Sequence, residues 1–461
     1  MKRSYEIDMC SGPIFPKIIR FALPLMFSGI LQLLFNAADI IVVGQFSGSE
    51  ALAAVGSTSS LISLLVNLFI GVSVGANVMA ARYYGAKNDR DLHETVHTAI
   101  CMALICGFAM VFIGILAARP LLHWMGTPDD VIEHSVLYMR IYFAGMPFFT
   151  VYNFGAAILR AAGDTRRPMY YLTMAGIINV IFNLLFVIVF HMGVAGVAIA
   201  TVISQGISAV LVIRCLLRSE GPYRLEKDAL HITGSKLRAM LQIGLPAGIQ
   251  GTLINLSNVL IQSSINSFDS LAMAGGTAAG NLENFLYVSV NAISQTVLSF
   301  TSQNMGAGNY KRVDRVVVQC ILTVCGVSIV LGSAGYLFGG QILRLYSPDS
   351  QVVSFGMERL SITMLPYALC GIMDTMPGCL RGIGCSVTPM VISLTGICLF
   401  RILWIITVFR VSHTLTTLYL SYPVSWLLTS IVQVICFLIM RKRKFIAAKE
   451  KVHYLQIMAE G

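Results

Sequence analysis

The sequence has 461 residues, of which 56% are hydrophobic and only 12% are charged. Soluble domains carry roughly a quarter charged residues, so this composition excludes a sizeable soluble domain and indicates a membrane protein. The formal net charge is +10 at pH 7, yet no basic patch interleaved with aromatic residues occurs. We therefore expect membrane lipids and small molecules as partners, and no nucleic acid.

About a dozen apolar stretches follow one another along the chain, each long enough to cross a bilayer as a helix of ~20 residues. Charged or Gly/Pro-rich breaks separate them, and they cover 17–43, 52–81, 93–117, 131–159, 168–190, 195–217, 239–267, 275–303, 314–340, 351–380, 389–409 and 415–440. Prolines 24, 147, 246 and 366 fall inside these stretches, where a missing backbone N–H can bend a helix. The predicted fold class is an all-α membrane protein with twelve transmembrane helices.

The second half of the chain repeats the first. Leu23-Pro24 returns as Leu245-Pro246, a shift of 222 residues, and Asn36 maps onto Asn258 at the same shift. The pairs Gly85/Gly306, Arg160/Arg381, Gly163/Gly384 and Pro168/Pro389 share a shift of 221, and Arg140 maps onto Arg359 at 219. Six spans are an even number, so both halves begin on the same side and form a parallel repeat of two six-helix lobes.

This repeat divides the chain into four predicted parts. They are an N-terminal lobe (1–217, helices 1–6), a cytoplasmic linker (218–236), a C-terminal lobe (237–440, helices 7–12) and a cytoplasmic basic tail (441–461). Two lobes related in this way leave a cavity between them that can open to either side of the membrane.

Lysine and arginine predict the orientation. With the N-terminus placed inside, 26 of the 32 fall in inner segments, including Lys2, Arg3, Lys449 and Lys451. Three fall in outer loops (Arg119, Arg344, Arg410) and three within spans (Arg140, Arg359, Arg401). Cytoplasmic loops are enriched in these residues, so we expect a multi-pass protein of the plasma membrane with both termini in the cytoplasm.

Several segments resemble motifs of the multidrug and toxin extrusion (MATE) family. Asp39–Gly44 followed by Ala51–Gly56 resembles its first-loop pattern, and Leu159–Met169 resembles its Leu-Arg-Gly-x-Gly-Asp-Thr-Arg-x-Pro-Met signature after span 4. Gly193–Thr201 resembles the entry to span 6, whereas Cys385–Thr388 departs from the signature in the second half. The resemblance covers nearly the whole chain. It implies twelve spans in two lobes and export of cationic and amphipathic compounds, driven by inward flow of protons or sodium.

Asp39 is the first candidate for the coupling of such export to an ion. A carboxylate near the centre of a spanning helix costs ~3 kcal/mol, and Asp39 follows a long part of span 1 that has no other charge. Low dielectric favours the neutral form, so such a group can take up a proton, or bind sodium if oxygens surround it. Asn179 and Asn183 lie four residues apart on one face of span 5, and Thr201 lies in span 6.

We therefore expect Asp39, Asn179, Asn183 and Thr201 to form an ion-coupling site for a proton or sodium. In one branch of the MATE family an aspartate of span 1 faces a polar cluster from spans 5 and 6, and these four residues match those places. Some relatives have a second aspartate where this chain has Asn183. This difference leaves open whether the coupling ion is sodium or a proton. The alternative is that Asp39 lies hydrated near the outer end of its helix.

A second site for a cation or substrate is predicted in the second half. Its candidates are two in-span acids and a polar row on one side of span 7: Glu283, Asp374, Asn255, Asn258 and Gln262. Other branches of the family place an ion-binding glutamate in span 7, where this chain has no acid. The alternative for the two acids is interhelical hydrogen bonding that stabilises packing. For the adjacent Glu358 and Arg359 we expect a local ion pair or a place at the membrane interface.

The predicted function is secondary antiport, in which drugs or other small organic, often cationic, compounds leave in exchange for protons or sodium. We expect a monomer without a cofactor, and no metal other than sodium at the Asp39 cluster. The alternative is a flippase for a lipid-linked precursor in the same superfamily, although such proteins often have extra spans and a basic cavity. The chain contains no Walker A motif, so an ATP-driven pump is not expected. It has one HExxH match (His93–His97) and one GxSxG match (Gly71–Gly75), both within apolar spans; a bare motif match is weak evidence, and we expect no enzyme. The repeat argues against a receptor but does not exclude a channel.

Overall fold

The computed structural model describes residues 5–460, and it describes their side chains except for residue 49 and residues 447–460. Of the inner basic residues counted above, Lys2 and Arg3 lie outside this range, and the side chains of Lys449 and Lys451 lie outside the described side chains. Helices make up most of the described chain, and residues 5–460 contain no β-strand.

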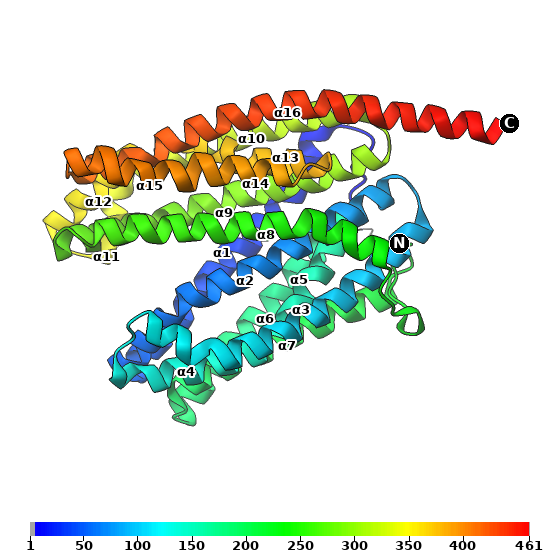
Figure 1. Cartoon of the computed structure of the whole chain (residues 1–461). Coiled ribbons are helices and arrows are strands. Elements are labelled where there is room, and N and C mark those ends of the chain that lie inside the picture. The colour runs from blue at the N-terminus through cyan, green and yellow to red at the C-terminus, as the bar shows by residue number, and fades with distance from the viewer. Residues whose placement is uncertain (1–4, 461) are drawn as a thin grey trace. The chain divides into compact units, whose positions relative to one another are not determined.

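The first compact unit contains the residues up to Asp8 and Leu23–Gly248. Its helices are α1 (Ile14–Phe46, from Leu23), α2 (Gly48–Gly85), α3 (Asp89–Trp124), α4 (Asp129–Ala144), α5 (Met146–Ala161), α6 (Arg166–Leu184) with the π-turn η1 (Leu185–Val189), α7 (Gly193–Arg218) and the first part of α8 (Gly234–Ile265). Within this unit α5 packs against α2, α3 and α7, and α6 and α7 lie side by side (Figure 1).

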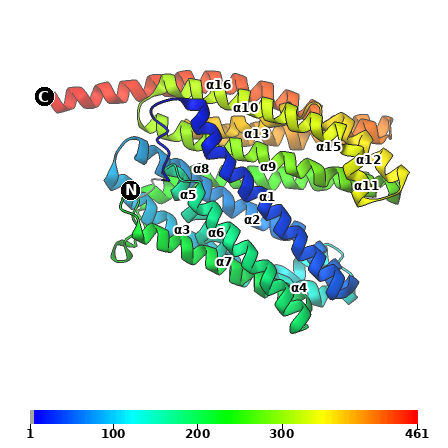
Figure 2. The ribbon, with the colours of Figure 1, turned by 180° about the vertical axis from the view of Figure 1, so that it is seen from behind.

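The second compact unit contains Met9–Ala22 and the chain from Ile249 onward. Besides the rest of α1 and α8 it holds α9 (Ser270–Gly306), α10 (Tyr310–Leu337), α11 (Gly339–Tyr346), α12 (Ser350–Thr363), α13 (Tyr367–Gly382), α14 (Val387–Ser393), η3 (Leu394–Leu399), α15 (Phe400–Trp404), η4 (Ile405–Phe409) and α16 (Leu415–Glu460). Here α13 packs against α9, α10 and α16, as Figure 2 shows from the opposite side. The α16 helix continues through the segment predicted as a basic tail.

The two units share one pattern of helix packing. In the first, α5 contacts α2, α3 and α7; in the second, α13 contacts α9, α10 and α16. The shorter helices α4 and α12 also correspond, since α4 packs on α2 and α7 whereas α12 packs on α9 and α16. Equivalent helices therefore meet equivalent neighbours, as the internal repeat predicts.

The repeat extends to the backbone conformation of individual turns. Lys87 and Gly308 both adopt a left-handed conformation, with φ of +52° and +70°. The following residues, Asn88 and Asn309, donate their backbone N–H groups to the carbonyl oxygens five residues earlier, at 3.1 and 2.9 Å. A positive φ is rare outside glycine, so its occurrence at Lys87, the position equivalent to Gly308, marks one turn used twice.

The signature loop after span 4 has the same relation to its counterpart. Gly163 and Gly384 have φ of +98° and +91°, a conformation that suits glycine. The next residues, Asp164 and Cys385, donate their N–H groups to carbonyl oxygens five residues earlier, at 2.9 and 2.8 Å. The backbone of this loop is thus kept in the second half although Cys385 replaces the aspartate.

Two predicted spans are broken where proline indicated a bend. The helices α4 and α5 meet at an angle of 45° around Gly145, directly before Pro147. In the second unit α12 ends at Thr363, and α13 begins after Pro366. Both breaks follow from the missing N–H of proline, which cannot donate to the preceding turn.

The described chain has twelve helical passes at the predicted places. Eight helices between residues 14 and 446 are individually long and apolar enough to cross a membrane, and the bent pair α4 and α5 adds a ninth. The three remaining passes are α8, α9 and the pair α12 and α13. They are less apolar because they carry the polar residues described below, yet they occupy the repeat positions of apolar spans in the first half.

The stretch predicted as a linker, 218–236, folds against the first unit. The backbone N–H of Glu226 donates to Nε2 of His97 at 3.0 Å. At the start of α8, Lys236 forms an ion pair with Asp91 and is itself buried. The linker is therefore packed as part of this unit.

Candidate ion-coupling site

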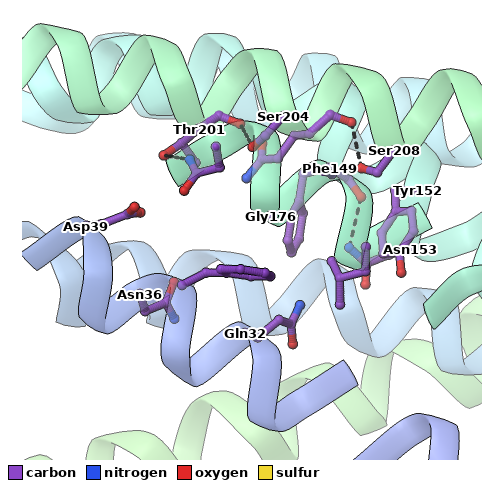
Figure 3. Close-up of a pocket in the computed structure, with 15 residues that line it drawn as sticks. Gln32, Asn36, Asp39, Phe149, Tyr152, Asn153, Gly176, Thr201, Ser204 and Ser208 are labelled. Carbon is purple, nitrogen blue, oxygen red and sulfur yellow. Dashed lines mark hydrogen bonds between the residues drawn. The ribbon is translucent and has the colours of Figure 1, made fainter. Parts of the chain in front are cut away.

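Four helices of the first unit enclose a pocket of about 120 Å³. It is lined by Gln32, Phe35, Asn36 and Asp39 of α1, by Phe149, Tyr152 and Asn153 of α5, by Leu172, Ala175, Gly176 and Asn179 of α6, and by Thr201, Ser204, Gln205 and Ser208 of α7. Figure 3 shows Asp39 and Thr201 facing this space from α1 and α7. A volume of this size has room for several water molecules, a hydrated ion or a small organic group.

The structure brings together the four residues predicted as the ion-coupling site. Asn183 Nδ2 donates to Asp39 Oδ1, and it also lies 3.2 Å from Asn179 Oδ1. Asn179 Nδ2 donates in turn to Thr201 Oγ1 at 3.4 Å. A continuous line of polar contacts thus runs from the carboxylate of α1 through two amides of α6 to a hydroxyl of α7.

Asn183 of this cluster is fully buried, and its Oδ1 accepts no hydrogen bond from the side chains and backbone that the structure describes. A buried acceptor without a donor is costly, by ~1–3 kcal/mol, and it lies in the side chain that already contacts Asp39. The donor set of carboxylate, amide and hydroxyl oxygens is one that sodium accepts and also one that can exchange a proton.

The pocket depends on a glycine where two helices approach. A Cβ at Gly176 would lie 1.8 Å from the Phe35 ring, so a larger residue on α6 would expel that ring. Glycine at this place leaves room for the Phe35 ring next to α6, and Phe35 lines the pocket together with Asp39. The local sequence thus combines a polar cluster with an aromatic wall.

Several lining residues were missed by the sequence analysis. On α7, Thr201 is followed by Ser204, Gln205 and Ser208 at spacings that place all four on one helix face. On α1, Gln32 precedes Asn36 by four residues and was not considered at all. These stripes were detectable as polar residues at helical spacing within apolar spans, but serine and glutamine change the hydropathy of a span too little to stand out.

In the second unit, Glu283 of α9 forms a buried ion pair across helices. Arg359 of α12 donates through Nε and Nη2 to its two carboxylate oxygens, at 3.0 and 2.7 Å. The hydroxyl of Thr363 donates to the same carboxylate at 2.7 Å. The local ion pair expected between Glu358 and Arg359 is wrong, since Glu358 accepts from Thr416 instead; the alternative of a place at the membrane interface stays a prediction. Successive residues on a helix do not face each other, so the partner of Arg359 comes from another helix.

The other candidates of the second unit do not gather around Glu283. Asn258 accepts from Arg401 Nη1 at 2.9 Å, and Gln262 donates to Asn266 at 3.2 Å. Asp374 Oδ2 is buried without a hydrogen-bond partner. Asn255 is half-buried on α8, one turn before Asn258. The five predicted residues of the second half therefore do not form one cluster.

Comparison with known proteins identifies the family. The family model MatE matches the chain twice, over residues 24–185 and 246–407. The chain belongs to the MatE family. Both ends of the two matches differ by 222 residues, the offset of the repeat deduced from the sequence. The protein is thus a multi-pass membrane transporter of the MATE type and not an enzyme.

Relatives of this MATE protein match along most of its length. It is 31% identical over 390 residues to the probable multidrug resistance protein YoeA of Bacillus subtilis, covering 82% of this chain and 83% of that protein. It is 26% identical to the FAD transporter of Shewanella oneidensis, covering 86% and 88%. Among solved structures, that of MATE in complex with MaL6 has a TM-score of 0.87 at 20% identity, covering 96% of this chain and 98% of the other. At this identity the last likeness shows the fold alone.

Proposed function

We propose that this MATE transporter exports drugs or other small organic compounds, and that protons or sodium ions entering through the Asp39 cluster drive the export. The names of relatives such as the probable multidrug resistance protein YoeA support the substrate class. The observation that carries the coupling proposal is the contact of Asp39 with Asn183, whose second oxygen has no partner. A cation bound at Asp39 would therefore touch the same side chains that join α1, α6 and α7.

The cluster gives ion binding a structural consequence. With Asp39 ionised, its carboxylate accepts from Asn183 Nδ2. With Asp39 protonated, its O–H can donate to the unpartnered Asn183 Oδ1, which requires the amide to turn and changes its contact with Asn179. Sodium would likewise be held between the carboxylate and that oxygen. In either case α1 and α6 are held differently in the two states, which is the requirement for an ion to bias a conformational equilibrium.

The test uses Asp39→Asn in liposomes that contain the purified transporter. Asparagine keeps the size and can still accept from Asn183, but it cannot exchange a proton. A gradient of 100 mV supplies ~2.3 kcal/mol per charge, enough for a roughly 50-fold gradient of an uncharged substrate in one-for-one exchange. We expect Asp39→Asn to lower this ratio to one and to retain substrate binding. Proton and sodium gradients imposed separately identify the coupling ion.

Glu50→Gln is the matched control, because Glu50 is an exposed acid of α2 that does not line the pocket. It should transport like the parent protein. Transport by Asp39→Asn at the parental rate under the same gradient would contradict the coupling proposal.

We also propose that the transporter works in the plasma membrane as a monomer, with both termini in the cytoplasm. The distribution of lysine and arginine supports the orientation. Labelling of single cysteines introduced at Arg119 and Lys311 tests it in intact cells. A membrane-impermeant maleimide should modify position 119 and not position 311, and the opposite result would reverse the orientation.

A further inference from the structure

Arg359 of α12, Arg381 of α13 and Arg401 of α15 lie within helices of the second unit, and the first two have an acid close by. Arg359 forms the ion pair with Glu283. Arg381 lies near enough to Asp374 for the two charges to interact, and it donates to Gln250 at 2.6 Å. The third arginine, Arg401 of α15, differs from both.

Only neutral groups surround the Arg401 guanidinium in the described chain. Its Nε donates to Ser425 Oγ at 3.2 Å, and its Nη1 donates to Asn258 Oδ1 at 2.9 Å. The ring of Tyr422 lies 4.4 Å from the guanidinium carbon. Among residues whose side chains are described, no carboxylate lies at ion-pair distance from Arg401. Arg401 is only 3% exposed, so its charge is buried without a counter-ion.

The neighbouring charges do not supply that counter-ion. Arg359 also lies near Tyr422, with its guanidinium carbon 5.8 Å from the same ring. Arg359 already uses the carboxylate of Glu283. Two guanidinium groups thus lie near one tyrosine, and the carboxylate of Glu283 pairs with only one of them. A buried charge without compensation is costly inside a membrane protein, and such residues usually serve a ligand or an ion.

The cluster is accessible at its amide. Asn258 is exposed on α8, and its oxygen is the group that contacts Arg401 Nη1. An anion arriving at this face can replace the amide oxygen and gain a charge-assisted hydrogen bond. A guanidinium favours carboxylate or phosphate, because its planar N–H groups match two acceptor oxygens. The Tyr422 ring beside it offers an aromatic surface for the apolar part of the same molecule.

We propose that Arg401, with Asn258, Ser425 and Tyr422, forms a binding site for amphipathic organic anions that carry a carboxylate or phosphate group. This site lies in the second unit and is separate from the Asp39 cluster. It adds a substrate class of opposite charge to the cationic compounds expected from the sequence. Its binding step needs no ion gradient, so it is tested independently of the coupling proposal.

The test compares two probes that share a ring and differ in charge. Phenyl phosphate is the anion, and phenyltrimethylammonium is the cation. Their binding to the purified full-length transporter in detergent is measured by calorimetry. The variants are Arg401→Gln and Arg401→Lys, with Arg410→Gln as the control because Arg410 is exposed.

We expect the parent and Arg410→Gln to bind phenyl phosphate equally. Arg401→Gln should bind it about 10- to 100-fold more weakly, as loss of a charged hydrogen-bond partner predicts, and Arg401→Lys should be intermediate. The affinity for phenyltrimethylammonium should stay unchanged in all of them. Absence of phenyl phosphate binding to the parent at millimolar concentration overturns the proposal, and so does equal affinity in Arg401→Gln. An equal loss of both probes in Arg401→Gln also overturns it, because it indicates that Arg401 only holds helices together.

Asn258→Asp keeps the test decisive if Arg401→Gln does not fold. It places a carboxylate of the chain on Arg401, at the position proposed for the ligand. We expect a more heat-stable protein that binds phenyl phosphate at least 10-fold more weakly. Undiminished phenyl phosphate binding in this variant contradicts the proposed site.

Discussion

Replacing Glu283 by glutamine should destabilise the second unit and leave ion coupling in the surviving protein intact. Glu283 and Arg359 have side chains that are only 13% and 9% exposed, and Glu283→Gln leaves Arg359 charged and buried. Breaking a buried pair in this way costs about 3–5 kcal/mol. The guanidinium cannot escape the cost by losing its proton, because arginine stays protonated in proteins.

The converse change should cost less. Arg359→Met leaves a carboxylate that can neutralise itself by taking up a proton, and the Thr363 hydroxyl still donates to it. We expect a loss of about 1–3 kcal/mol, that of one buried group with incomplete partners. The double variant Glu283→Gln, Arg359→Met removes both charges, and it should recover most of the stability lost in Glu283→Gln.

Thermal unfolding of the purified variants in detergent, followed by size-exclusion chromatography, measures these differences. The exposed pair Arg119–Glu133 is the control, with side chains 60% and 67% exposed; Glu133→Gln should cost less than ~1 kcal/mol. A Glu283→Gln variant as stable as the parent but inactive in gradient-driven transport would refute this reasoning. It would instead assign Glu283 to ion coupling.

Two further predictions follow from the first unit. Asn183→Leu removes the donor to Asp39 and the unpartnered oxygen together; gradient-driven export in liposomes should fall at least 10-fold with substrate affinity unchanged, and normal export would exclude Asn183 from the coupling site. Gly163→Ala forces a side chain into a left-handed position and places its Cβ 2.4 Å from the Ile7 carbonyl oxygen, so it should cost more than the ~1–3 kcal/mol of the backbone conformation alone. The matched change Gly308→Ala has positive φ but no neighbour within 4 Å of its Cβ, so equal melting temperatures for the two variants would contradict the steric argument.

The sequence predicted features that depend on neighbouring residues better than contacts between residues far apart in the chain. The spans follow from local hydropathy, and the breaks at Pro147 and Pro366 follow from one missing N–H in each. The Asp39 cluster was predictable because few polar groups were available to meet an acid in span 1. The partner of Arg359 was not predictable, because Glu283 lies 76 residues earlier and nothing in the local pattern relates the two. Asn258 was selected as a polar residue of span 7, but its contact with Arg401 was not predictable because the two residues lie 143 apart in the chain.

The division between the two compact units falls within two helices, after Ala22 in α1 and after Gly248 in α8. Each division is close to a proline of its helix, Pro24 or Pro246. A cut in the stretch 218–236 therefore does not yield two self-sufficient pieces. The N-terminal fragment would carry Met9–Ala22, which packs with the second unit, and the C-terminal fragment would carry the part of α8 up to Gly248, which packs with the first. Each fragment thus contains a segment that packs in the other unit, as in a domain swap. We therefore expect co-expressed halves to reassemble.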